Sequence, residues 1–133
     1  MRVAEAAGFV TYRGPVADVR PYIRAARIFV LPSFYREGTP RSVLEAMAMG
    51  RPIITTDVPG CRETVVPGRN GLLVPARDAR RLAKAILALI DDPKRAAAMG
   101  RESRKIAQAR YQVDKVTDAL LGFFWKTAKV NGA

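Results

Sequence analysis

The chain has 133 residues, with 23 lysines and arginines against 12 acidic residues and a formal net charge of +11. Its length suits one domain with a real core, and it shows neither an apolar run of about 18 residues nor a leader-like segment at Met1, so neither a membrane span nor export is indicated. The sequence contains no histidine and one cysteine, Cys61, which excludes an internal disulfide, a cysteine metal cluster and Ser-His or Cys-His catalysis.

The first part of the chain, residues 1–75, is predicted to alternate strands and helices. Apolar runs followed by turn residues are expected to form strands over residues 9–12, 28–31, 53–56 and 71–74. Asp18 is expected to cap a short helix that reaches Ala25, and a helix over residues 41–49 is expected to stop at Gly50. This order of elements indicates an α/β fold in which helices flank a parallel sheet.

The second part, residues 76–133, is predicted to be helical. The expected helices cover residues 78–90, 93–109 and 112–126. Asp78 is expected to cap the first, and Asp91 and Asp92 precede a proline, so they are expected to cap the second rather than to bind a metal. Gly100 is expected to bend or interrupt this second helix.

Glu37 and Glu45 lie eight positions apart, around the predicted start of the helix over residues 41–49. Thr39 is expected to be its N-cap and Pro40 its first residue, which would leave backbone amides of the first turn free to hold an anion such as phosphate. Carboxylates accept hydrogen bonds only, which suits the hydroxyl groups of a polyhydroxylated phosphate ester. The alternative is that both glutamates are solvated surface residues.

The residues around this pair resemble those of retaining glycosyltransferases of family four, a large group with the two-domain GT-B fold. The resemblance extends from about Val10 to about Tyr111 and is carried by short motifs: Gly14 with Asp18, Leu31-Pro-Ser33, Glu37 with Glu45, Gly50-x-Pro52, Pro59-Gly60 with Glu63, and Asn70-Gly-Leu-Leu-Val-Pro75. The segments over residues 36–42 and 55–61 are similar to bacterial enzymes that extend lipid-linked oligosaccharides, capsules or exopolysaccharides. The resemblance implies a partial Rossmann-like sheet from the carboxyl-terminal, donor-binding domain of such an enzyme.

The resemblance also implies a role for each matching residue. Glu37 would contact the donor sugar near the reacting centre and is the candidate catalytic residue, and Glu45 would bind the ribose. The residues expected at the donor sugar and the diphosphate are Gly38, Thr39, Pro40, Arg41, Ser42 and Val43. The residues expected beside the base are Val10, Tyr12 and Arg13.

Family members transfer a sugar with retention of anomeric configuration, and the acceptor hydroxyl is thought to attack from the face that the diphosphate leaves. The resemblance implies a donor that is a nucleotide sugar, with uridine the commonest base, a hexose or N-acetylhexosamine as the transferred group, and no metal or other cofactor. Two cationic residues and an amino-terminal acceptor domain precede the matched region in the family. The chain is therefore expected to cover the last third of a typical member and to be inactive alone.

Several partners follow from these readings. The expected partners are the nucleotide sugar and the missing acceptor domain. The basic helices are expected either to be solvated or to contact an anionic membrane surface. That contact would place a cytoplasmic protein at the inner face of the membrane. Nucleic acid is not expected, because no aromatic residues interleave with the basic ones. Aromatic residues at 123–125 either pack in the core or leave an apolar surface through which the chain forms a homodimer.

Two alternatives to the enzyme reading remain open on the sequence alone. The chain could be a nucleotide-sugar-binding module without catalysis, or a basic adaptor for anionic membrane surfaces.

Overall fold

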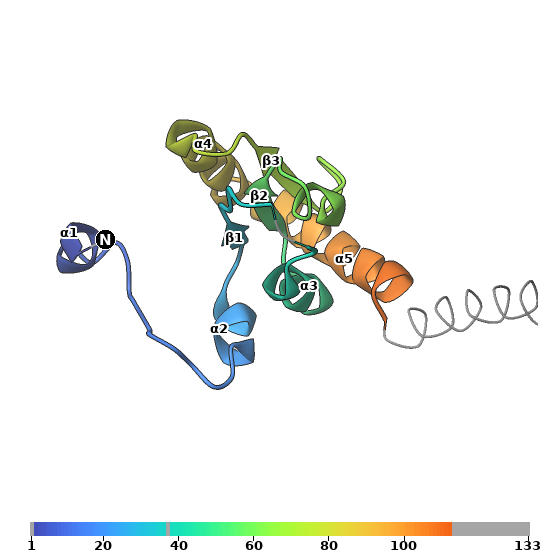
Figure 1. Cartoon of the computed structure of the whole chain (residues 1–133), viewed down its shortest axis with the longest axis horizontal. Helices are drawn as coiled ribbons and strands as arrows, with labels where there is room; N and C mark the ends of the chain where they lie inside the picture. The colour runs from blue at the N-terminus through green and yellow to red at the C-terminus, as the bar shows by residue number, and fades with distance from the viewer. Residues whose placement is uncertain (1, 37, 113–133) are drawn as a thin grey trace, which may run out of the picture.

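A three-stranded parallel sheet with the strand order β1-β2-β3 lies at the centre of the structure (Figure 1). The structure is a computed structural model that describes residues 2–36 and 38–112. The strands are β1 (Phe29–Leu31), β2 (Ile53–Thr56) and β3 (Gly71–Val74). They confirm three of the predicted strands, with Ile28 left out of the first, and they confirm the α/β class.

The register of the strands places alternate side chains on the two faces of the sheet. Phe29 pairs with Ile53, which in turn pairs with Gly71. Ile53 packs in the core on one face and Ile54 in the core on the other, as the two-residue period of a strand requires. Gly71 is needed in this register, because a Cβ atom there would lie 1.9 Å from the carbonyl oxygen of Ile53.

Helices cover both faces of the sheet. The core on the first face lies beneath α2 (Arg20–Ala25) and α3 (Arg41–Ala48) and includes Ile23, Val43 and Met47. The core on the second face lies beneath α4 (Ala79–Ile90), which contributes Leu89. The long helix α5 (Pro93–Arg110) belongs to both, since Ala96 and Met99 pack in the second core and Ile106 and Ala107 in the first.

The caps of α4 and α5 are those that the sequence predicts. The Asp78 carboxylate accepts a hydrogen bond from the amide of Arg81 at 2.9 Å, and the Asp92 carboxylate accepts one from the amide of Arg95 at 3.0 Å. The predicted interruption at Gly100 is wrong, because α5 is one continuous helix. Gly100 instead lets α5 pass close to the turn after α3, since a Cβ atom there would lie 2.2 Å from the carbonyl oxygen of Gly50.

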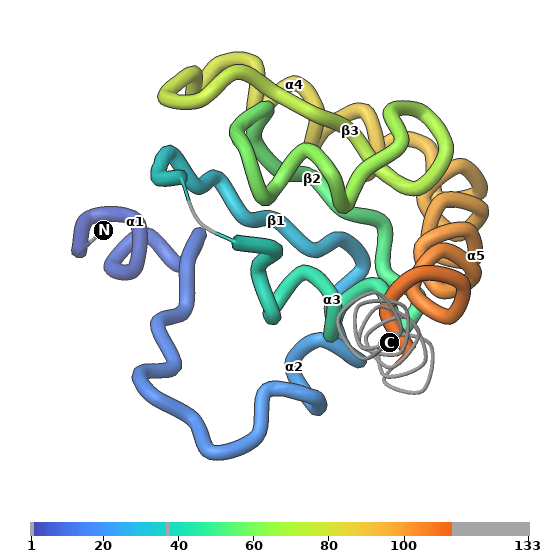
Figure 2. The backbone as a smooth tube through the Cα atoms, turned by 45° about the vertical axis from the view of Figure 1, so that its right-hand side comes forward, coloured from blue at the N-terminus to red at the C-terminus, as the bar shows by residue number. Residues whose placement is uncertain are grey.

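The amino-terminal segment lies away from the sheet (Figures 1 and 2). It forms a short helix, α1 (Arg2–Ala6), and then runs without regular structure through residues 9–19, so the strand predicted over residues 9–12 is wrong. The Tyr12 amide donates to the Glu5 carboxylate at 3.0 Å, and Phe9 is 86% exposed. Apolar residues alone do not make a strand, because the backbone groups also need a neighbouring strand to pair with.

The connection from β2 to β3 contains one short 3-10 helix, η1 (Arg62–Thr64), and is held by buried side chains. Cys61 is buried there as a free cysteine. No helix in the described ranges is long and apolar enough to span a bilayer. The predicted helix over residues 112–126, with its aromatic side chains, lies outside the described residues apart from its first position.

Candidate functional site

The loop from β1 to α3, together with the first half of α3, carries most of the predicted site residues. Gly38 and Thr39 are exposed in this loop, and Pro40 is buried at its end. The predicted N-cap is wrong by one residue, because Pro40 is the N-cap of α3 and the helix begins at Arg41. Pro40 takes the N-cap position in place of Thr39, with an extended backbone, ψ 123°, and without a side-chain cap hydrogen bond.

The first turn of α3 supplies backbone amides that the helix itself cannot satisfy. The amides of Val43 and Leu44 both donate to the carbonyl oxygen of Pro40, at 3.1 and 3.3 Å. Those of Arg41 and Ser42 lie too early in the helix to find a helical carbonyl. The Val43 amide is thus satisfied within the helix, and its side chain is fully buried in the core. The amides of Arg41 and Ser42 remain at the N-terminus of the helix.

Glu45 lies one turn further along α3 and forms an ion pair with Arg41. The Nε atom of Arg41 lies 3.1 Å from Oε1 of Glu45. The Glu45 side chain is 34% exposed and the Arg41 side chain is 91% exposed. Among the described residues, none donates a hydrogen bond to the second carboxylate oxygen, Oε2.

A cavity of about 520 Å³ opens beside this ion pair. One wall comes from α3, through Arg41 and Glu45, and the other from residues 17–20, at the start of α2. The volume lies within the range of roughly 300–1,000 Å³ that is common for small-molecule sites. The fold thus brings two segments that are distant in sequence to one polar cavity.

The second wall contains another ion pair. Asp18 receives both prongs of the Arg20 guanidinium, since Nε lies 2.9 Å from Oδ1 and Nη2 lies 2.9 Å from Oδ2. The Arg20 amide also donates to Oδ1 at 3.0 Å. These hydrogen bonds lower the pKa of the Asp18 carboxyl and raise the pKa of Arg20.

The residues predicted to lie beside the base do not line this cavity. Val10 and Tyr12 are exposed in the irregular segment before α2, and the Arg13 guanidinium lies over the Tyr22 ring, 5.9 Å from its centroid. Residues 17–20, a few positions later, form the wall instead. Glu37 lies outside the described residues, so its role stays a prediction.

A second, smaller cavity of about 230 Å³ lies where the three strands end. Its walls are largely apolar and include Phe34, Val74 and Leu82. Arg77 lies at this cavity with its guanidinium 4.7 Å from the centroid of the Phe34 ring. Apolar walls offer little to a polyhydroxylated ligand, so the cavity beside Glu45 is the better candidate for a nucleotide.

Sequence reasoning missed Arg20 as a residue of the site. The sequence predicts Asp18 as the cap of α2, which is wrong, because the N-cap of α2 is Val19 and the Asp18 carboxylate instead holds Arg20. The spacing Asp18-x-Arg20 at a helix start is a local signal for this ion pair. The position of this ion pair opposite Glu45 depends on tertiary packing, which no short sequence motif indicates.

Comparison with known proteins identifies the family of the chain. The family described as glycosyl transferases group 1 matches residues 2–92. A relative from Campylobacter jejuni, N,N'-diacetylbacillosaminyl-diphospho-undecaprenol alpha-1,3-N-acetylgalactosaminyltransferase, is 40% identical over 87 residues, which cover 65% of this chain and 23% of the relative. A D-inositol 3-phosphate glycosyltransferase from Pseudarthrobacter chlorophenolicus is 39% identical over 107 residues, 79% of this chain and 25% of the relative. The chain thus spans about a quarter of the length of these relatives.

Solved structures share the fold. Sucrose-phosphate synthase from Thermosynechococcus elongatus superimposes with a TM-score of 0.84 at 31% identity, over 98% of this chain and 34% of that protein. HepE from Anabaena, solved in complex with UDP, superimposes with a TM-score of 0.87 at 24% identity, over 94% of this chain and 35% of that protein. The same protein has been solved with UDP-glucose.

Proposed function

The chain belongs to the group 1 glycosyl transferases and has the fold of their carboxyl-terminal part, and from this premise we propose that it binds the nucleotide-sugar donor of a retaining glycosyltransferase. The donor is a UDP-sugar, and the group transferred is a hexose or an N-acetylhexosamine. The acceptor is a glycan or a lipid-linked saccharide held by a further part of the enzyme. The chain alone binds the donor without turnover.

The polar cavity beside α3 is the observation that carries this proposal. Glu45 lines this cavity, no described residue donates to its Oε2 atom, and the exposed Arg41 lies one helical turn nearer the helix start. A nucleotide with its ribose hydroxyls on Glu45 has its phosphates toward the amides of Arg41 and Ser42. Those amides and the positive end of the helix dipole favour an anion there.

The same arrangement suits the chemistry of sugar transfer. The bond between the anomeric carbon and the diphosphate oxygen breaks, the acceptor hydroxyl forms the new bond on the same face of the sugar, and its proton leaves with the diphosphate. Negative charge builds up on the departing diphosphate, and pre-aimed amides and cations stabilise it without reorganisation. Arg41 and the first turn of α3 supply part of this stabilisation. Glu37 positions the sugar.

Replacing Glu45 tests the donor site. We expect Glu45→Ala to weaken UDP binding by about ten- to a hundredfold, because a charged hydrogen-bond acceptor is worth roughly 1.5–3 kcal/mol. Titration calorimetry of the 133-residue chain with UDP measures this change. Asp91→Ala is the matched control, since it removes one carboxylate from the exposed end of α4 without touching the cavity.

Equal affinities of the parent and Glu45→Ala would contradict the assignment, as would the absence of UDP binding by the parent. Glu37→Ala is expected to change the ratio of UDP-glucose to UDP affinity more than the UDP affinity itself. Detectable transfer of sugar by the chain alone would contradict the view that the acceptor part lies elsewhere.

A further inference from the structure

Arg20 is a charged residue of the donor cavity to which the proposed function gives no task. It lies 25 positions before Glu45 in the sequence, yet both line the same cavity. The charge of Glu45 also acts on Arg20, in the same direction as that of Asp18. Arg20 is therefore near enough to Glu45 to act on the same ligand.

The Asp18 carboxylate fixes the orientation of the Arg20 guanidinium. Nε and Nη2 each donate to it at 2.9 Å, and the Arg20 amide anchors the same carboxylate at 3.0 Å. The N–H groups of Nη1 and the second N–H of Nη2 remain for a ligand. A planar guanidinium held in this way presents donors in a fixed pattern and selects ligands with matching acceptors.

The chemistry of a nucleotide decides which part of it Arg20 meets. In a nucleotide the phosphate leaves C5′ and the base leaves C1′, while the 2′- and 3′-hydroxyls lie between them. With these hydroxyls on Glu45 and the phosphates at the first turn of α3, the base points away from the helix start. The wall that remains for it is the one formed by residues 17–20.

We infer that Arg20 selects the base of the donor, so that the site takes nucleotides whose base carries a carbonyl oxygen at C4 of a pyrimidine or C6 of a purine, as in uracil and guanine. The site binds these in preference to cytosine or adenine, which carry an amino group at that position. This inference rests on the proposed donor site. Uracil presents O4, and guanine presents O6 beside N7, as acceptors for arginine donors. Cytosine and adenine present an amino group at the equivalent edge, and this group repels a second donor.

Affinities for four nucleoside diphosphates test the inference on the complete 133-residue chain. The parent is expected to bind UDP and GDP about tenfold more tightly than CDP and ADP. Arg20→Ala is expected to remove most of this difference by weakening UDP and GDP while leaving CDP and ADP near their parent values. The UDP-to-CDP ratio is the sharpest readout, because those bases differ at one edge.

Arg24→Ala is the matched control, since it removes the same charge from an exposed position of the same helix that does not line the cavity. It is expected to keep the parent order of affinities. Equal affinities of the parent for all four nucleotides would overturn the inference. So would an Arg20→Ala variant that weakens all four by the same factor, because Arg20 would then act on the phosphates.

Both of these results would leave the donor site itself standing, provided that Glu45→Ala still weakens every nucleotide. If the parent binds none of the four, the inference and the proposed function fail together. Circular dichroism of each variant shows whether the chain keeps its overall helix content. Arg20→Lys retains the charge but loses the planar guanidinium, and it is expected to show an intermediate UDP-to-CDP ratio.

Discussion

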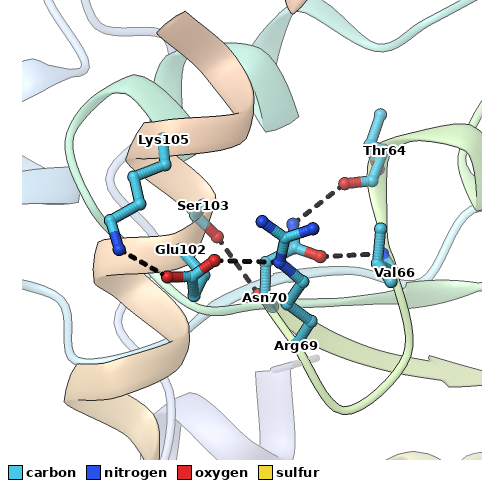
Figure 3. A network of polar contacts seen from close by, with 7 residues as sticks. All are labelled: Thr64, Val66, Arg69, Asn70, Glu102, Ser103 and Lys105. Carbon is cyan, nitrogen blue, oxygen red and sulfur yellow. Dashed lines mark hydrogen bonds and ion pairs between the residues drawn. The ribbon is translucent and has the colours of Figure 1, made fainter. Parts of the chain in front are cut away.

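Asn70 is a fully buried polar residue at the start of β3, and each of its polar groups has a partner (Figure 3). Its side-chain oxygen accepts a hydrogen bond from the amide of Val66 at 2.7 Å, and its side-chain nitrogen donates to the carbonyl oxygen of Thr64 at 3.0 Å. Ser103 on α5 donates to the carbonyl oxygen of Asn70 at 3.1 Å. One residue thus joins the loop after β2, the strand β3 and the helix α5.

Asn70→Ala is expected to lower the free energy of unfolding by about 2–4 kcal/mol. The change leaves the backbone groups of Val66 and Thr64 without partners, and each buried unpaired group costs roughly 1–3 kcal/mol. Urea denaturation followed by circular dichroism measures this loss.

Arg69→Ala is the matched control at the neighbouring position. Arg69 pairs with Glu102 at 2.9 Å, and its side chain is 55% exposed, so solvent screens the interaction. We expect its stability to stay close to that of the parent. Equal losses for the two variants would show that the buried amide of Asn70 is not what holds the loop.

Single-residue predictions from the sequence succeed where the interaction is local. Asp78 and Asp92 cap their helices because a cap depends only on the next few residues. Pro40 takes the position predicted for Thr39 because both residues suit a helix start, and only the backbone course of the loop decides between them. The pairing of Arg20 with Asp18 is also local, but its position across the cavity from Glu45 depends on tertiary structure.

Among the elements, α5 depends on a close approach between two glycines. Gly50 has a positive φ of 71° in the turn after α3, and Gly100 faces it from the middle of α5. The sequence predicts that Gly100 bends or interrupts this helix, but the helix is continuous. The structure shows that the glycine lets the helix pack against the turn.

Gly100→Ala is expected to destabilise the protein by about 1–3 kcal/mol, although alanine favours a helix. The new Cβ atom would lie 2.2 Å from the Gly50 carbonyl oxygen and 3.4 Å from Cδ of Pro52, so α5 must shift outward. The gain in helix propensity, about 1 kcal/mol, does not offset this overpacking. Thermal unfolding measures the difference.

Ala98→Gly, an exposed position of the same helix, provides the comparison. It introduces a glycine without changing any close contact and is expected to cost about 1 kcal/mol. A Gly100→Ala variant more stable than the parent would refute the close approach of the two glycines.

The strands show that an apolar run forms a strand only where a neighbouring strand is present. Residues 53–56 form the central strand with a neighbouring strand on both sides, so the strand predicted from their apolar run is confirmed. Residues 9–12 have a similar apolar pattern, but no described strand lies beside them. A pattern of side chains cannot show whether a partner for the backbone is present.

At the scale of the whole molecule, the amino-terminal segment exposes large apolar side chains. Val3 is 85% exposed, Phe9 86% and Tyr12 63%. Exposed large apolar side chains favour association between molecules when they gather on one surface. We expect the chain to self-associate as its concentration rises, which sedimentation velocity measures.

Phe9→Ser is expected to shift this association to higher concentration. Leu87→Ser is the control, since Leu87 is an exposed apolar residue on α4, away from the amino-terminal segment. A single monomeric species at high concentration would contradict the expectation. The aromatic residues near the carboxyl terminus, from which the sequence also predicted association, lie outside the described residues.

The course of α5 through both cores has a consequence for how the protein opens. A helix whose first half seals one core and whose second half seals the other cannot leave either without exposing both. The two layers should therefore lack separate opening events, and amide protons of β2 and α5 should exchange with solvent at one shared rate set by global unfolding. Hydrogen-exchange mass spectrometry that found α4 and α3 protected to the same degree as β2 would show one cooperative unit, whereas earlier loss of either layer would show two.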